Sequence, residues 1–103
     1  MQKKFGLSGI GISDKTEVTD VPFTVYPNPS DGQLYYDFYL YKTSQVSLSI
    51  FDISGKIADR LSLGSLNSGK HIVKSICMLS PGVYICQLNT GDSISFVKLL
   101  ISR

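Results

Sequence analysis

The amino-acid sequence predicts an all-β fold, an antiparallel β-sandwich of about seven strands. The first indication is that apolar and polar side chains alternate along several short segments, which is the period of a strand with one buried face. The second is that clusters of Gly, Pro, Asn, Asp and Ser separate these segments at short intervals. Since no segment of useful length shows a helical period, we expect two sheets packed face to face.

The sequence is expected to form one domain, residues 22–103, behind a flexible linker or arm at residues 1–21. A chain of 103 residues with 43% hydrophobic content is long enough to bury a single core. Between Gly6 and Gly11, glycines alternate with isolated apolar residues, and residues 13–20 are mainly polar and charged. Because this composition is typical of a linker, we expect the strands to begin near Pro22.

A rigid corner is expected between the first two strands, Phe23–Tyr26 and residues 34–41. Pro27 and Pro29 each hold φ at about −65° and lack an N–H donor, so they block continued pairing after the first strand. Gly32 can take the positive φ that lets the second strand begin.

In the second strand, the expected core side is Leu34, Tyr36, Phe38 and Leu40, and the expected half-exposed side is Tyr35, Asp37, Tyr39 and Tyr41.

A tight hairpin is expected after the third strand. That strand should bury the apolar members of its alternation, Val46, Leu48 and Ile50. In the turn, Asp52 can accept hydrogen bonds from backbone amides, and Gly55 can take the left-handed conformation. The partner strand is expected at residues 57–63.

Three further strands complete the expected set, at residues 69–76, 84–89 and 93–101. Before the second of these, Pro81 and Gly82 suit a turn across which the side chains on either side can pack, namely those of Leu79 and Tyr84. Inside that strand the expected core side is Tyr84, Cys86 and Leu88, which alternate with Ile85, Gln87 and Asn89.

The charge of the chain names no partner. Ten Lys and Arg against eight Asp and Glu give a net charge of +2, which is too weak to predict nucleic-acid binding or a membrane-binding surface. No apolar run approaches the roughly 18 residues that a membrane span needs, so we expect no direct membrane insertion. Residues 1–9 lack a continuous apolar stretch, so no amino-terminal export signal is expected there.

The chemistry-bearing residues do not assemble into a recognisable catalytic or metal motif. Cys77 and Cys86 have a spacing that fits no zinc-ligand pattern, and His71 is the only histidine, so we expect no metal site and no cofactor. The two cysteines are compatible with one disulfide or with buried free thiols. The carboxylates show no acid and base spacing, and His71, expected on a surface strand, has no orienting Asp, so we predict no enzyme.

Several turn and strand motifs occur in a specific order along the chain. The series is Tyr26, Pro27, Asn28, Pro29 and Gly32, then Phe51, Asp52, Gly55 and Lys56, then Leu79, Gly82 and Tyr84, and finally Lys98, Leu99, Leu100 and Ile101. Over residues 22–103 this order resembles the C-terminal sorting domain of type IX secretion cargo (Por secretion system, type A), a family of the Bacteroidota. Phe51 stands where that family often has Tyr, and Cys77 and Cys86 are not part of its pattern.

The resemblance implies a small Ig-like β-sandwich behind a larger exported cargo domain. It implies a secretion signal that directs the cargo from the periplasm through the outer-membrane type IX translocon. A sortase-like protease then usually removes the domain, and the cargo is anchored at the cell surface or released. The arm at residues 6–20 is the expected place for that cleavage, because proteases prefer accessible and poorly ordered backbone.

The last strand has apolar residues on both of its faces, a pattern with two explanations. An ordinary central strand is one. The other is our hypothesis that the translocon reads this strand by strand addition, through Val97, Lys98, Leu99, Leu100, Ile101, Ser102 and Arg103.

The tyrosines of the second strand suggest a function of another class. Tyr35, Tyr39 and Tyr41 share a face with Asp37, and an exposed aromatic row could stack on sugar rings in a carbohydrate-binding or adhesive module at the cell surface. Tyrosine also has a high strand propensity and packs well on neighbouring strands, which explains the same row without a ligand.

Overall fold

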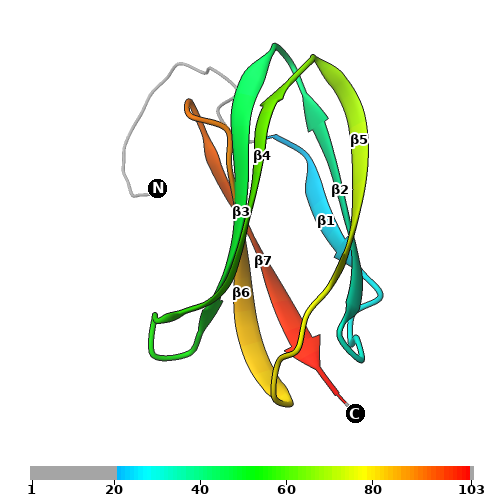
Figure 1. Cartoon of the computed structure of the whole chain (residues 1–103), viewed down its shortest axis with the longest axis vertical. Helices are drawn as coiled ribbons and strands as arrows, with labels where there is room; N and C mark the ends of the chain where they lie inside the picture. The colour runs from blue at the N-terminus through cyan, green and yellow to red at the C-terminus, as the bar shows by residue number, and fades with distance from the viewer. Residues whose placement is uncertain (1–20, 103) are drawn as a thin grey trace, which may run out of the picture.

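The computed structural model describes residues 21–102 and shows two antiparallel sheets packed face to face (Figure 1). The three-stranded sheet has the order β1-β2-β5, and the four-stranded sheet has the order β4-β3-β6-β7. The bounds are β1 Phe23–Tyr26, β2 Gln33–Leu40, β3 Ser44–Asp52, β4 Ile57–Leu66, β5 Gly69–Ile76, β6 Gly82–Asn89 and β7 Ile94–Ile101. The predicted all-β sandwich with an Ig-like arrangement is confirmed.

The chain passes between the sheets three times, from β2 to β3, from β4 to β5 and from β5 to β6. The remaining connections join strands that pair within one sheet: β1 with β2, β3 with β4, and β6 with β7. The segment containing Pro81 and Gly82 is therefore a crossover between sheets, and it carries β5 into β6 at one end of the sandwich.

The core lies between the sheets and is made by the alternating residues that the sequence predicts to face inward. In β2 the inward side chains are nearly inaccessible, with Leu34 at 0% and Phe38 at 1% exposure. The buried apolar set is Val25, Leu34, Tyr36, Phe38, Leu40, Val46, Leu48, Ile50, Cys77, Leu79, Tyr84, Cys86, Leu88, Leu99 and Ile101. Burial of this surface is the main favourable term in folding, so both sheets are needed for stability.

Two differences from expectation bear on the packing of the sandwich. β4 extends three residues beyond the expected end at Leu63, and its pairing with β3 has two register shifts. One leaves Leu63 as the extra residue of a β-bulge, and the other leaves Ala58 as the extra residue between Ile57 and Asp59. The expected surface position of His71 is wrong. His71 is half-buried, since it pairs with the inward-facing Phe38 and stacks on its ring at 5.5 Å.

The two cysteines are buried free thiols, the second of the two states compatible with the sequence. Cys77 follows β5, and its Sγ lies 3.9 Å from the hydroxyl oxygen of Tyr36. Cys86 lies in the middle of β6, where burial raises the pKa of its thiol to about 12. Both therefore act as small apolar residues of the core.

Candidate functional site

The candidate site is the last strand, β7, together with the corner at residues 27–30. β7 is at the edge of the four-stranded sheet and pairs with β6 alone among the strands, so the alternative of a central strand is wrong. Its inward side chains are buried, with Leu99 at 0% and Ile101 at 1% exposure. The outward side chains are exposed, including Phe96 and Leu100. One apolar face of the strand is thus core and the other is open.

The side chain of Asn28 holds the outer edge of β7. Its Nδ2 donates to the backbone oxygen of Lys98 at 2.7 Å, and its Oδ1 accepts from the backbone N–H of Leu100 at 3.0 Å. A carboxamide has a donor and an acceptor in the same relation as a peptide unit, so it substitutes for a neighbouring strand at this position. A residue 72 positions earlier in the chain therefore fixes the backbone of the last strand.

Ser30 continues this pairing by one step. Its backbone N–H donates to the oxygen of Leu100 at 2.9 Å, and its own oxygen accepts from the N–H of Ser102 at 2.8 Å. Ser30 and Ile101 form a parallel bridge. The corner, expected only to end the first strand and lead into the second, thus also pairs with β7 and occupies its outer edge from Lys98 to Ser102.

A short turn places Ser30 for this role. The Ser30 hydroxyl donates to the oxygen of Gln33 at 2.8 Å and accepts from the N–H of Gly32 at 3.0 Å. Asp31 accepts from the N–H of Gln33 through Oδ1 at 3.1 Å. Gly32 has the predicted positive φ, 119°, and its oxygen accepts from the N–H of Cys77. Ser30 is 2% exposed, and these bonds satisfy its buried polar atoms.

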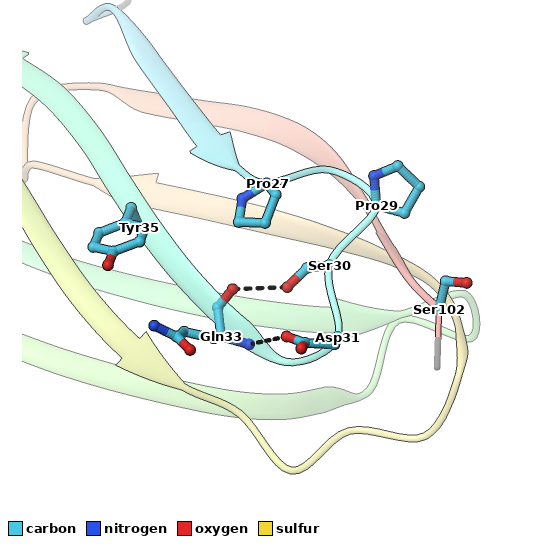
Figure 2. A pocket seen from close by; sticks show the side chains of 7 residues that line it. All are labelled: Pro27, Pro29, Ser30, Asp31, Gln33, Tyr35 and Ser102. Carbon is cyan, nitrogen blue, oxygen red and sulfur yellow. Dashed lines mark hydrogen bonds between the residues drawn. The ribbon is translucent and has the colours of Figure 1, made fainter.

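An open hollow of about 600 Å³ lies beside this turn (Figure 2). It brings the corner and the end of the last strand together, and its lining is Pro27, Pro29, Ser30, Asp31, Gln33, Tyr35 and Ser102. Figure 2 shows the carboxylate of Asp31 turned to the backbone of Gln33, to which it is bonded. The lining offers proline and tyrosine surfaces with a few hydrogen-bonding groups, which suits contact with a peptide more than acid and base chemistry.

The second group of motif residues lies in the β3–β4 hairpin. Asp52 Oδ1 accepts from the N–H and the hydroxyl of Ser54 and from the N–H of Lys56, at 2.6 to 3.0 Å. The bonds from Ser54 and Lys56 hold the pKa of Asp52 below its ordinary value. Gly55 has a φ of 89°. The predicted roles of Asp52 and Gly55 in a tight hairpin are confirmed.

The third group lies at the crossover into β6. Leu79 and Tyr84 are both buried, as expected for side chains that pack across the turn. The Tyr84 hydroxyl donates to the oxygen of Ser80 at 2.6 Å, which satisfies the polar end of the buried ring. Gly82 begins β6 next to this ring, and a Cβ there would lie 3.9 Å from Tyr84 Cε2.

The structure therefore brings only part of the predicted set together. Pro27, Asn28 and Pro29 lie against Lys98–Ser102, whereas the groups around Asp52 and Leu79 support other turns of the scaffold. Arg103 and the arm at residues 1–20 lie outside the described residues. The pairing by Asn28 and Ser30 was missed, although one signal was visible: Asn28 is the residue between two prolines that has a side-chain donor and acceptor.

The tyrosines of the three-stranded sheet pair with one another. Tyr35 stacks on Tyr26 of the neighbouring strand with ring centroids 5.4 Å apart, and Tyr39 meets Tyr41 edge to face at the same distance. Ring surfaces that would receive a sugar are thus partly covered by neighbouring rings. The packing explanation of this row is favoured over a carbohydrate site.

Residues 21–102 offer neither of two other common kinds of site. Within this range, no three His, Cys, Asp or Glu side chains gather in a group that could hold a metal ion. The described residues contain no helix long and apolar enough to cross a membrane.

Comparison with protein families gives one match. The family model of the secretion system C-terminal sorting domain matches residues 24–102, from β1 to the end of β7. No curated protein matches the chain.

Proposed function

This chain belongs to the family of secretion system C-terminal sorting domains, and on that premise we propose that the exposed side of β7 is the part read by the export machinery. The domain is a sorting signal for type IX secretion and acts with the secretion machinery on an exported protein. The family is one of sorting signals and not of enzymes. The components that it contacts and the residues that they contact belong to the proposal.

One observation carries this proposal: β7 is held rigidly while one of its faces stays open. Its backbone is bonded to β6 on one side and to Asn28 and Ser30 on the other. Its outward side chains, among them Lys98 and Leu100, are exposed. A fixed backbone with open side chains lowers the entropic cost of binding, as a recognition element requires.

The same contacts refine how residues 97–103 are read. Strand addition along the outer edge between Lys98 and Ser102 requires release of the four hydrogen bonds made by Asn28 and Ser30. Recognition through the outward side chains requires no such release. We therefore assign recognition to the exposed face of β7, with the corner as the support of that face.

The test uses a reporter fused in front of the full chain in a bacterium with a type IX system. The double variant Lys98→Glu with Leu100→Ser changes two exposed side chains of β7 and leaves Leu99 and Ile101 in the core. The reporter should accumulate in the periplasm, and its surface or medium fraction should fall by about tenfold or more. Immunoblots of the separated fractions measure this.

The matched control is Lys74→Glu with Ile72→Ser, which makes the same kinds of change on the exposed face of β5. The control should be exported like the parent, and both variants should keep the parent's thermal unfolding midpoint. Normal surface delivery of the β7 variant would contradict the proposal.

The further steps of export rest on the same premise. We propose that the upstream cargo passes the outer-membrane translocon, that a sortase-like protease cuts within residues 6–20, and that the cargo is then anchored at the surface or released. This segment lies outside the described residues. Peptide mass mapping of the mature surface protein should find no peptide that joins cargo to β1, and an intact junction would argue against processing.

A further inference from the structure

The outer face of the four-stranded sheet carries a band of apolar side chains across all four strands. Residues that pair directly across antiparallel strands lie on the same face. Ile57 of β4 pairs with Phe51 of β3, Phe51 pairs with Ile85 of β6, and Ile85 pairs with Lys98 of β7. In the next row Val83 pairs with Leu100. The band therefore joins the proposed recognition strand to three other strands.

Most of this band is accessible. Ile57 is 50% exposed, Leu100 is 39% and Val83 is 37%, while Phe51 and Ile85 are half-buried. Phe96, two residues before Lys98, adds a ring that is 60% exposed. Soluble monomers rarely expose a large contiguous apolar patch unless it binds something, so the band has the character of a docking surface.

The charges on this face are all positive. By strand register the face carries Lys98 and Arg60, which is the partner of Ser49. The carboxylates of the described residues lie elsewhere. Asp52 is bonded within its hairpin, Asp59 pairs with the inward-facing Ile50, Asp37 lies on the other sheet, Asp31 lies in the turn after the corner, and Asp92 contacts Lys42 in the loops.

The positive charges on this face indicate which kind of partner could bind there. A second copy packed face to face would bring the cations of one face against those of the other, which disfavours a dimer through this surface. A protein surface that is apolar and carries carboxylates would match both the band and its cations. Charge complementarity of this kind also guides encounter and orientation.

We propose that the outer face of the four-stranded sheet is the docking surface for a component of the secretion machinery whose contact surface is apolar and acidic. The inference rests on the proposed function and deepens it. The surface that is read extends from β7 over β6 and β3 to β4, and it includes residues more than forty positions before the last strand.

The test changes the band away from β7. Ile57→Thr with Val83→Thr replaces two exposed apolar side chains by a residue that keeps strand propensity. In the reporter fusion, the exported fraction should fall by about tenfold or more. The control is Ile72→Thr with Ile76→Thr, on exposed positions of β5 in the other sheet, and it should export normally. Circular dichroism melts of the purified fusions should coincide.

Comparison with the β7 variant separates the two proposals. One outcome is that the β7 variant, Lys98→Glu with Leu100→Ser, is not exported while Ile57→Thr with Val83→Thr is exported normally. This outcome would overturn the extended surface and leave the sorting role of β7 intact. Normal export of both variants would overturn both proposals. Reduced export of both variants supports the extended surface.

A photo-crosslinking amino acid at Val83, with Ile72 as the control position, identifies the occupant in living cells. A covalent adduct with a protein of the secretion machinery, seen from Val83 and not from Ile72, is the expected result. An adduct between two copies of the fusion would overturn the proposal. The proposal would also be overturned if the purified fusion sediments with phosphatidylglycerol vesicles and the Ile57→Thr, Val83→Thr variant does not. The surface would then bind a membrane.

Discussion

The outer faces of the two sheets differ in whether their side chains find partners within the domain. On the three-stranded sheet, Tyr26 stacks on Tyr35, and the Lys70 ammonium lies 3.7 Å from the Asp37 carboxylate. On β5, Ile72 lies between Lys70 and Lys74 and is 54% exposed, and Ile76 at the end of the strand is 70% exposed. On the four-stranded sheet, exposed and half-buried apolar residues follow one another across the strands, and among residues 21–102 the charges placed on that face are the cations Arg60 and Lys98.

Under the proposed function, the two faces have different roles. On the three-stranded sheet, two pairs of rings and one ion pair form within the domain, although Ile72, Lys74 and Ile76 stay exposed. On the four-stranded sheet, a partner with an apolar and acidic surface would bury the exposed apolar side chains and bring carboxylates next to the cations, and both changes favour binding. The exposed face of β7 belongs to the four-stranded sheet, and the following predictions test this difference between the faces.

The largest expected effect separates the two sides of β7. Leu99→Ala removes a fully buried side chain and should lower the free energy of unfolding by about 2–5 kcal/mol. Leu100→Ala changes the neighbouring exposed side chain and should lower it by less than about 1 kcal/mol. Urea unfolding followed by circular dichroism measures both. Equal losses at the two positions would show that the outer face is as important for folding as the core.

The next effect concerns the support of that face. Asn28→Ala removes both side-chain hydrogen bonds to β7 and should cost about 1–3 kcal/mol, with faster hydrogen exchange at the Leu100 amide. Asn28→Asp keeps an acceptor for Leu100 but sets its second carboxylate oxygen against the carbonyl oxygen of Lys98, so it should not restore the stability lost in the alanine variant. Unchanged hydrogen exchange at the Leu100 amide in Asn28→Ala would contradict the role of Asn28 in supporting β7.

The hairpin that places Phe51 beside Ile57 depends on Gly55. Its φ of 89° disfavours a branched side chain, and a Cβ there would meet no atom within 4 Å, so Gly55→Val tests the backbone alone. We expect a loss of about 1–2 kcal/mol in the free energy of unfolding. Gly55→Asn should lose less, because Asn tolerates this conformation better than Val. Thermal and urea unfolding check the order.

Asp52 in the same hairpin makes the stability of the folded domain depend on pH in the acidic range. Hydrogen bonds from Ser54 and Lys56 lower the pKa of Asp52 in the folded state from its ordinary value of 3.8. A carboxyl with a lowered folded pKa adds stability above its ordinary pKa, and that stability is lost as the pH falls through the folded value. The difference in stability between the parent and Asp52→Asn should therefore be full near neutral pH and shrink below about pH 4. Urea midpoints over this range measure it.

The smallest effect is expected on the internally paired face. The Lys70 ammonium is exposed and lies 3.7 Å from the half-buried carboxylate of Asp37, and ion pairs near the surface contribute little in water. Lys70→Gln should change the free energy of unfolding by less than about 0.5 kcal/mol and leave export of the reporter unchanged. A clear loss of export in this variant would mean that the machinery also contacts the three-stranded sheet.

The sequence was sufficient to predict the strands and their buried sides, because alternation reports burial directly. Leu34, Phe38 and Leu88 are all inside the sandwich as their spacing predicts. The β-bulge at Leu63 was not predicted, since nothing in the local pattern marks where one strand gains a residue over its partner. The position of His71 was misjudged because alternation along β5 is weak and its ring packs on Phe38 from another strand.

The site could be predicted in its parts but not in its assembly. The prolines identified a corner and the apolar pattern identified β7 as unusual, both from local sequence. The bonds from Asn28 to Lys98 and Leu100 join positions about seventy residues apart, and no local rule gives such pairing. The apolar band could not be predicted either. Ile57, Phe51 and Ile85 lie in one row with Lys98 only because of the register between the strands.

The bonds between the corner and β7 also set an order of events during synthesis. Leu99 and Ile101 seal the core, and Asn28 and Ser30 have no edge to hold until residues 98–102 exist. A ribosome that stalls before residue 94 leaves both sheets unsealed, so the truncated product stays open to proteolysis. The sandwich can therefore close only after the chain has been made through β7.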